Sequence, residues 1–196
     1  MSIKQFNGTY FLNEDRILFR FNTQNQEEYR FWLTRRTTLF VLAATAHLLA
    51  KKLEQTHSPD AAKALGEFEK QAILDTAKVD NSQAQVYESG THFPLGFDPI
   101  LVMDVTCALT KNGEKIAKIE DVKEGEIDDA LSVDFALPGG ANINLKLAGN
   151  TLQTMRILLD QLRQQAGWGE AVMRTNELPV DDEIFQAKSH EKISIH

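Results

Sequence analysis

Side chains that could carry chemistry gather between residues 16 and 36, where arginines alternate with aromatic and aliphatic residues. Leu18 and Arg20 are two positions apart, and so are Arg30 and Trp32. On a β-strand this spacing places side chains on one face. Arginine neutralises phosphates and carboxylates, and tryptophan stacks on bases or anchors protein contacts. The sequence therefore predicts a binding face formed by Leu18, Arg20, Arg30 and Trp32.

This face has a plainer alternative. Another part of the chain, such as the 91–99 loop, could cover Trp32 and Leu18, and the arginines could pair with Glu27 and Glu28. The sequence does not choose between an open and a covered face.

Arg35 and Arg36 precede a long apolar stretch and are expected near the start of a helix. The positive end of a helix dipole disfavours cations there by roughly a few tenths of a kcal/mol, so something should offset it. Solvent and a nearby carboxylate would suffice. The alternative is an anion, such as phosphate, held between the two arginines and the helix N-terminus.

Other reactive residue types lack the partners that catalysis or metal binding needs. His47 lies in an apolar stretch with no second histidine four positions on, which favours a hydrogen-bonded core histidine. Cys107 alternates with apolar residues and is expected to be a buried, inert thiol. The acidic run 120–129 lacks the oxygen spacing of a calcium loop. We therefore expect no metal, no cofactor and no enzyme, although an active site gathered from residues such as His47 and His92 would leave no motif.

Composition limits the class of protein. The chain has 196 residues, 42% hydrophobic and 25% charged, which suits one domain with a conventional core. Its net charge of −7 argues against coating duplex DNA, although residues 1–36 alone carry +2. The longest apolar run, 39–50, is far shorter than the roughly 20 residues of a membrane span. With one cysteine and no signal-peptide pattern, a cytoplasmic protein without a membrane partner is expected.

A hairpin and two helices should position the candidate face. Apolar residues alternate with the candidate residues along both arms of the hairpin: Ile17, Phe19, Phe21, Tyr29, Phe31 and Leu33. This pattern predicts that one row of side chains packs beneath a helix and the other faces outward. A helix is expected over 37–55, apolar on nearly every side and therefore covered on both sides. A second helix over 59–77 is the expected cover.

The second half of the chain shows a similar order after an irregular loop over 78–99. The expected elements are a strand over 100–110, an edge strand over 114–122, a hairpin of 131–137 with 141–147, and a helix from Asn150 to Gly167. In the first of these strands one face would hold Leu101, Met103, Val105, Cys107 and Leu109. The acidic tail over 176–196 is expected to be flexible unless Ile184 and Phe185 dock.

The two hairpins superimpose at a shift of 114 residues, with Leu33 over Leu147 and all six apolar positions apolar in both. The helices align at a shift of 113, with Leu39 over Leu152. Two interpretations remain: a duplication of units 9–56 and 100–167, or generic amphipathic patterns that match by chance.

The second unit, with the strands that begin at Ile100 and Glu114, has the order strand-strand-strand-strand-helix. Its hairpin and helix read "ALSVDFALPGGANINLKLAGNTLQTMRILLDQL", and the first unit contains "RILFRFNTQNQEEYRFWLTRRTTLFVL". In element order and hairpin style, over about half of the chain, this resembles the PUR-repeat and Whirly-type folds. The resemblance implies two curved sheets backed by helices, with single-stranded nucleic acid bound on an open sheet face.

These patterns together predict an α+β fold: antiparallel hairpins in one or two curved sheets backed by helices, in a single domain over 1–175. The expected function is a non-enzymatic interaction module that uses the face around Trp32. Its partner could be a second copy of the chain, another protein or single-stranded nucleic acid.

Overall fold

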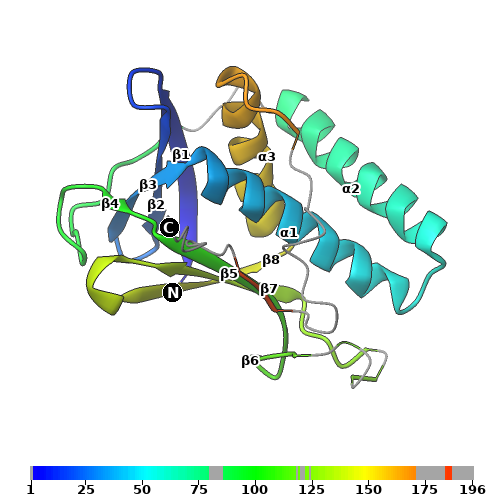
Figure 1. Ribbon diagram of the computed structural model, residues 1–196. Helices are drawn as coiled ribbons and strands as arrows, with labels where there is room; N and C mark the ends of the chain where they lie inside the picture. The colour runs from blue at the N-terminus through cyan, green and yellow to red at the C-terminus, as the bar shows by residue number, and fades with distance from the viewer. Residues whose placement is uncertain are drawn as a thin grey trace, which may run out of the picture.

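The first three strands form an antiparallel meander, which a short fourth strand extends into sheet 1 (Figure 1). In spatial order the strands are β1 (Ile3–Phe11), β2 (Arg16–Thr23), β3 (Glu28–Thr34) and β4 (Ile100–Leu101). β4 runs parallel to β3, and the other neighbours are antiparallel. This computed structural model describes residues 2–79, 86–117, 119, 122–123, 125–170 and 184–186.

Sheet 2 is built by the second half of the chain. Its strands, in spatial order, are β6 (Glu114–Lys115), β5 (Asp104–Lys111), β7 (Ala130–Ala136) and β8 (Asn142–Ala148), and β9 (Ile184–Gln186) also pairs with β5. Asn112 and Gly113 join β5 to β6 with φ angles of 52° and 82°, so the predicted hairpin is confirmed. Its second strand, predicted over 114–122, ends at Lys115; residues 118, 120 and 121 lie outside the described residues.

Three helices accompany the sheets in the described part of the chain, which confirms the predicted α+β class. They are α1 (Arg35–Glu54), α2 (Pro59–Val79) and α3 (Gly149–Gln165), and residues 138–140 form a single 3-10 turn. α1 begins two residues earlier than predicted because Thr34 and Thr37 form a capping box. α3 begins at Gly149, one residue before the predicted start at Asn150, and no side chain caps it. α2 packs along α1 as predicted.

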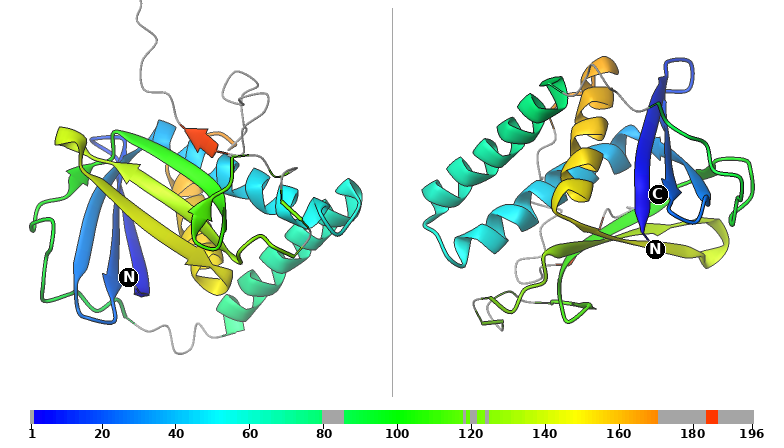
Figure 2. Two further views of the ribbon diagram at one scale, coloured as in Figure 1. Left: turned by 90° about the horizontal axis from the view of Figure 1, so that it is seen from below. Right: turned by 180° about the vertical axis from the view of Figure 1, so that it is seen from behind.

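The helix of each half of the chain packs against the sheet of the other half. β3 leads into α1, and α1 packs against β5 of sheet 2; β8 leads into α3, and α3 packs against β1 of sheet 1. Figure 2 shows both helices on the inner side of the two sheets. Each half of the chain therefore contributes the helix that covers the first strand of the other half.

The core lies between the two sheets and these helices. The inward residues Ile17, Phe19, Phe21, Phe31 and Leu33 are all 0% exposed, so the predicted phase of the first hairpin is confirmed. The ring of Phe135 on β7 lies 6.4 Å from Phe19 and 5.4 Å from Phe31, which joins sheet 2 to sheet 1. One hydrophobic core thus serves both halves.

The two units share one register. Ile17 lies opposite Leu33 and Leu131 lies opposite Leu147, as the shift of 114 requires. The predicted shift of 113 for the helices is wrong. A shift of 114 superimposes buried helix positions, Thr38 on Leu152 and Val41 on Met155 among them, whereas a shift of 113 lays the exposed Ala46 on the buried Leu159. The first unit has three strands before its helix, β1 to β3, and the second has four, β5 to β8, as predicted; β6 is the short additional strand, with two residues.

The single strand predicted over 100–110 is also wrong, because the chain changes sheets within it. The Val102 amide donates to the Trp32 carbonyl at 3.0 Å, and the next amide, of Met103, donates to the Ala136 carbonyl at 2.9 Å. Residues 100–101 therefore belong to sheet 1 and residues 104–111 to sheet 2. Val105, Cys107 and Leu109 are buried as predicted, but Leu101 is half-buried and Met103 is exposed.

The C-terminal segment docks in part. Residues 184–186 form β9, antiparallel to β5. The rest of the tail predicted over 176–196 lies outside the described residues.

Candidate interaction face

The four predicted binding residues lie together on the outer face of sheet 1. In the β2–β3 register Leu18 is opposite Trp32 and Arg20 is opposite Arg30. All four side chains are half-buried. The structure therefore brings the predicted residues together and also shows that part of their surface is already covered.

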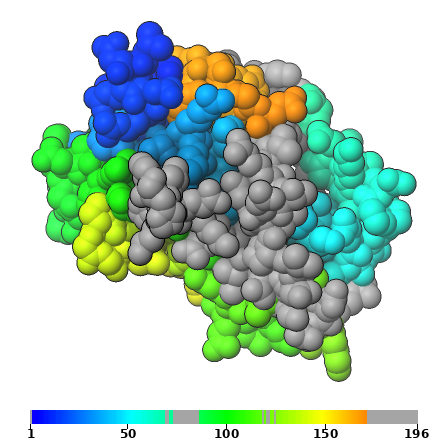
Figure 3. Space-filling view, in the orientation of Figure 1, coloured from blue at the N-terminus to red at the C-terminus, as the bar shows by residue number. Residues whose placement is uncertain are grey.

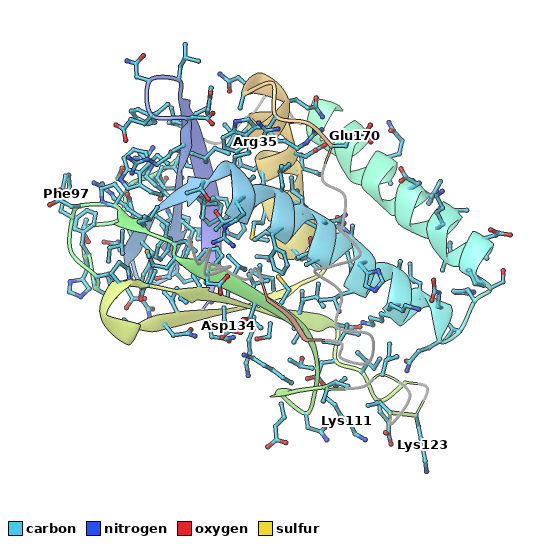
Figure 4. The ribbon with its side chains drawn as sticks, viewed as in Figure 1. Arg35, Phe97, Lys111, Lys123, Asp134 and Glu170 are labelled. Carbon is cyan, nitrogen blue, oxygen red and sulfur yellow. The ribbon has the colours of Figure 1, made fainter. Side chains whose placement is uncertain are left out.

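Residues 86–97, which we call the covering segment, occupy the half of this face that carries the arginines. The Arg30 guanidinium lies 4.7 Å from the ring centre of Phe93 and 4.0 Å from that of Phe97, and it donates to the Phe97 carbonyl at 3.2 Å. In Figure 4 Phe97 projects beyond the outer side of sheet 1. Arg30 keeps only 13% of its side chain exposed, so this arginine is a structural contact of the covering segment.

Arg20 is held by neutral groups of the same region. It donates to Asn7 Oδ1 at 2.5 and 3.2 Å, and its guanidinium lies 5.1 Å from the ring centre of Tyr87. Burial, and then the charge of Glu28, raise the pKa of the Tyr87 hydroxyl. On the Arg20–Arg30 half of the face, the chain therefore covers its own arginines, which is the plainer of the two alternatives.

Glu28 pairs with Arg30, as the alternative for a covered face expected, and it also anchors the covering segment, which the sequence pattern did not indicate. Its side chain is 0% exposed. One carboxylate oxygen accepts from Arg30 Nε at 2.7 Å and the other accepts from the Gly90 amide at 2.7 Å. A side chain at Gly90 would begin 2.7 Å from the Gln26 carbonyl oxygen, so only glycine lets the backbone approach this closely. The Ser89-Gly90 pair was the one sequence signal of this contact.

In the described part of the chain, the Trp32 half of the face keeps exposed apolar side chains. We call Phe11, Leu18, Trp32 and Leu101 the aromatic patch. The rings of Phe11 and Trp32 meet edge to face at 5.2 Å, and Leu101 lies beside Trp32 on β4. Phe11 is 39% exposed, and the adjoining Leu12 and Met103 are 77% and 44% exposed. Apolar area of this kind on a sheet face is typical of a contact surface.

The predicted anion site holds protein contacts at one of its two arginines. Arg36 donates to the Met103 carbonyl at 2.9 Å and lies 3.9 Å from Asp104. Arg35 is exposed at the start of α1 (Figure 4), where its charge helps to lower the pKa of Asp15. The carboxylate interpretation therefore accounts for both residues.

The β1–β2 turn beside the patch is tied to the end of α3. Trp168 Nε1 donates to Asp15 Oδ1 at 2.7 Å, and the hydroxyl of Tyr10 donates to the same atom at 2.9 Å. Figure 3 shows this hairpin against the C-terminal turn of α3. The Trp168 ring packs edge to face on Tyr10 at 5.6 Å.

This contact makes the turn sensitive to acid. The Trp168 indole and then the Tyr10 hydroxyl hold the pKa of Asp15 below its ordinary value. A lowered folded-state pKa stabilises the fold above the unfolded value of about 3.9, and this stability is lost as the pH falls through the folded-state pKa. Asp15→Asn should therefore melt at a lower temperature than wild type at pH 7, with the difference shrinking towards pH 2. A difference that stayed constant across this range in thermal melts would contradict the assignment.

Catalytic groups do not converge in the described residues. His47 is half-buried, and burial followed by Lys51 lowers its pKa; burial raises the pKa of the Cys107 thiol, which is 0% exposed as predicted. A groove of about 1250 Å³ lies between α1, α2 and α3, and no histidine is among the described residues that line it. No group of three potential metal ligands occurs within the described ranges.

A polar cluster occupies the outer face of sheet 2. Asn144 donates to Ser132 Oγ at 2.6 Å and to Asp134 Oδ1 at 2.9 Å, and Lys115 lies 2.7 Å from Asp134. These groups satisfy one another, so the cluster presents no activated nucleophile.

Among the described residues, every helix is too short or too polar to cross a bilayer. Comparison with protein-family models, with curated proteins and with solved structures finds no match to this chain.

Proposed function

We propose that this chain is a non-enzymatic interaction module that self-associates through the aromatic patch. The observation that carries the proposal is the position of Trp32: its ring lies on the outer face of sheet 1 against Phe11, beside exposed apolar neighbours. A half-buried tryptophan on an open sheet face gains the most when a second protein surface removes its remaining contact with water.

The charges around the face favour a protein partner over nucleic acid. Four basic side chains around it lie within 4 Å of carboxylates of the same chain, in the pairs Lys4–Glu88, Arg16–Glu14, Arg30–Glu28 and Arg36–Asp104, and Arg20 is held by Asn7 and Tyr87. Binding to a phosphate backbone requires uncompensated positive charge. The paired arginines add little net field, so the rings supply most of the binding energy.

A second copy of the chain is the partner that this surface fits. A twofold contact places the same patch on both sides, so its centre must tolerate its own image and its rim must carry both signs of charge. The aromatic patch has an apolar centre. Its rim carries Arg16 next to Glu14, and Arg36 next to Asp104. Two such rims can face each other without a block of like charge.

The proposal is tested by replacing Trp32 with glutamate. The buried carboxylate would have to be desolvated in the contact, so the dimer should dissociate at concentrations where wild type is dimeric. Sedimentation velocity of both proteins measures this. Phe68→Glu is the matched control, because Phe68 is 71% exposed on α2, away from the patch. If Trp32→Glu and Phe68→Glu had the same effect, the patch would not be the interface.

Single-stranded nucleic acid is distinguished in the same experiment. A labelled oligonucleotide that binds wild type with an affinity falling as salt rises, and fails to bind Trp32→Glu, would replace self-association as the function of the patch.

A further inference from the structure

β1 and β5 are equivalent strands in the two units. Gly8 lies opposite Phe19 in β2, and Cys107 lies opposite Val133 in β7, where Phe19 and Val133 are themselves equivalent. Phe6, Gly8 and Tyr10 of β1 therefore correspond to Val105, Cys107 and Leu109 of β5. Each strand is also the one on which the other unit's helix packs.

The outer edges of these strands differ. On β5, the segment β9 pairs antiparallel with residues 106–108, with Phe185 opposite Cys107 and Ile184 opposite Ala108. β1 is the last strand of sheet 1, and among the described residues its outer edge has no neighbouring strand (Figure 2, right). The nine residues of this edge are an open template for main-chain hydrogen bonds.

The inward side chains of β1 are less buried than their counterparts on β5, as expected if β1 lacks a neighbouring strand. Val105, Cys107 and Leu109, which have β9 and β6 alongside their strand, are all 0% exposed. Their counterparts Phe6 and Tyr10 are half-buried. Both point to the same inner side of sheet 1, where Phe6 stacks on Phe19 at 5.6 Å. A strand added beside β1 would complete the burial of these two rings.

The position of α3 on the inner face of β1 limits which kind of strand can pair with the edge of β1. α3 lies over β1 so closely that a side chain at Gly8 would begin 2.4 Å from a methyl of Leu162. Pairing β1 with β1 of a second copy would set the two strands about 5 Å apart with an α3 helix packed on each, whereas packed helices need about 8–10 Å between their axes. A single extended segment without its own helix meets no such obstacle, because β9 sits on β5 beneath α1.

We propose that the outer edge of β1, at Asn7–Thr9, binds an extended segment of a partner protein that is apolar at alternate positions. The segment adds to sheet 1 as β9 adds to sheet 2, with its central residue opposite Gly8. Main-chain hydrogen bonds hold it, and its apolar side chains cover Phe6 and Tyr10. This site uses the edge of sheet 1 and is independent of the aromatic patch.

Register-specific cross-linking tests the site, with a synthetic peptide of residues 180–190 as the probe. By equivalence, position 184 of the peptide should lie opposite Thr9 and position 186 opposite Asn7. The full chain carrying Thr9→Cys should therefore form a disulfide several-fold faster with the peptide bearing cysteine at 184 than with the peptide bearing it at 186. Native Cys107 is fully buried and does not compete.

Three outcomes would overturn the proposal. Equal rates of disulfide formation for the two peptides would show random collision and no strand pairing in a fixed register. Cross-linking to a chain with Ala108→Cys in preference to one with Thr9→Cys would show that the peptide only displaces β9. Disulfide-linked dimers of the double variant Thr9→Cys and Ile184→Cys, formed without peptide, would make the C-terminal segment of a second copy the occupant.

Discussion

Glu28→Ala should lower the free energy of unfolding by about 3–5 kcal/mol, as expected when one partner of a buried ion pair is removed. The Arg30 guanidinium would lose the carboxylate 2.7 Å away while remaining under Phe97, and the Gly90 amide would lose its acceptor. The covering segment should loosen as a result. Urea unfolding followed by circular dichroism measures the change.

A surface ion pair supplies the control for Glu28. Glu88 pairs with Lys4 at 2.6 Å, but its side chain is 60% exposed, so Glu88→Ala should cost less than about 1 kcal/mol. The double variant Glu28→Met and Arg30→Met should recover most of the lost stability, because it removes both charges together. If Glu28→Ala cost no more than Glu88→Ala, the buried pair would not be what fixes the covering segment.

Phe135→Ala should cost about 3–5 kcal/mol, the usual range for deleting a buried aromatic ring. The ring contacts Phe19 and Phe31, so the cavity would open at the junction of sheets 1 and 2. Thermal and urea unfolding should both show the loss, with a single transition because the halves share one core.

A ring on the surface supplies the comparison for Phe135. Phe68→Ala removes a ring that is 71% exposed and should change stability by less than about 0.5 kcal/mol. A loss below about 1 kcal/mol for Phe135→Ala, or two separate transitions in the wild type, would contradict a shared core.

Much of the fold could be predicted because period-2 alternation reports burial directly. Phe19, Phe31 and Leu33 alternate with the outward row, and the structure buries them as expected. The strand around 100–110 could not be predicted, since apolar alternation does not reveal that residues 102 and 103 bond to different sheets. Local pattern fixes which side a residue faces, but not which sheet supplies its neighbour.

The sequence predicted where the candidate face lies, but not which half of it the rest of the chain covers. Alternation places Arg30 and Trp32 on the same outer row, yet the contacts that separate them come from Phe93 and Phe97, more than sixty residues away. The burial of Glu28 depends likewise on the distant backbone of Gly90. Interactions across such distances leave no periodic signal in the sequence.

The reciprocal helices could not be predicted from either unit alone. Each unit by itself suggests that its helix covers its own hairpin, whereas α1 also packs on β5 and α3 packs on β1. The sequence aligned the two hairpins at a shift of 114, and the structure extends the same shift to the buried positions of the helices.

The central claim is that a second copy covers Trp32, and tryptophan quenching tests it most directly. In Trp168→Phe the indole at position 32 is the sole tryptophan. Acrylamide quenching of this variant should fall as the protein is concentrated from the monomer to a species of twice 22.1 kDa, measured by light scattering on the same samples. Quenching that stays constant while the mass doubles would place the interface elsewhere, and a mass that remains 22.1 kDa at high concentration would contradict self-association itself.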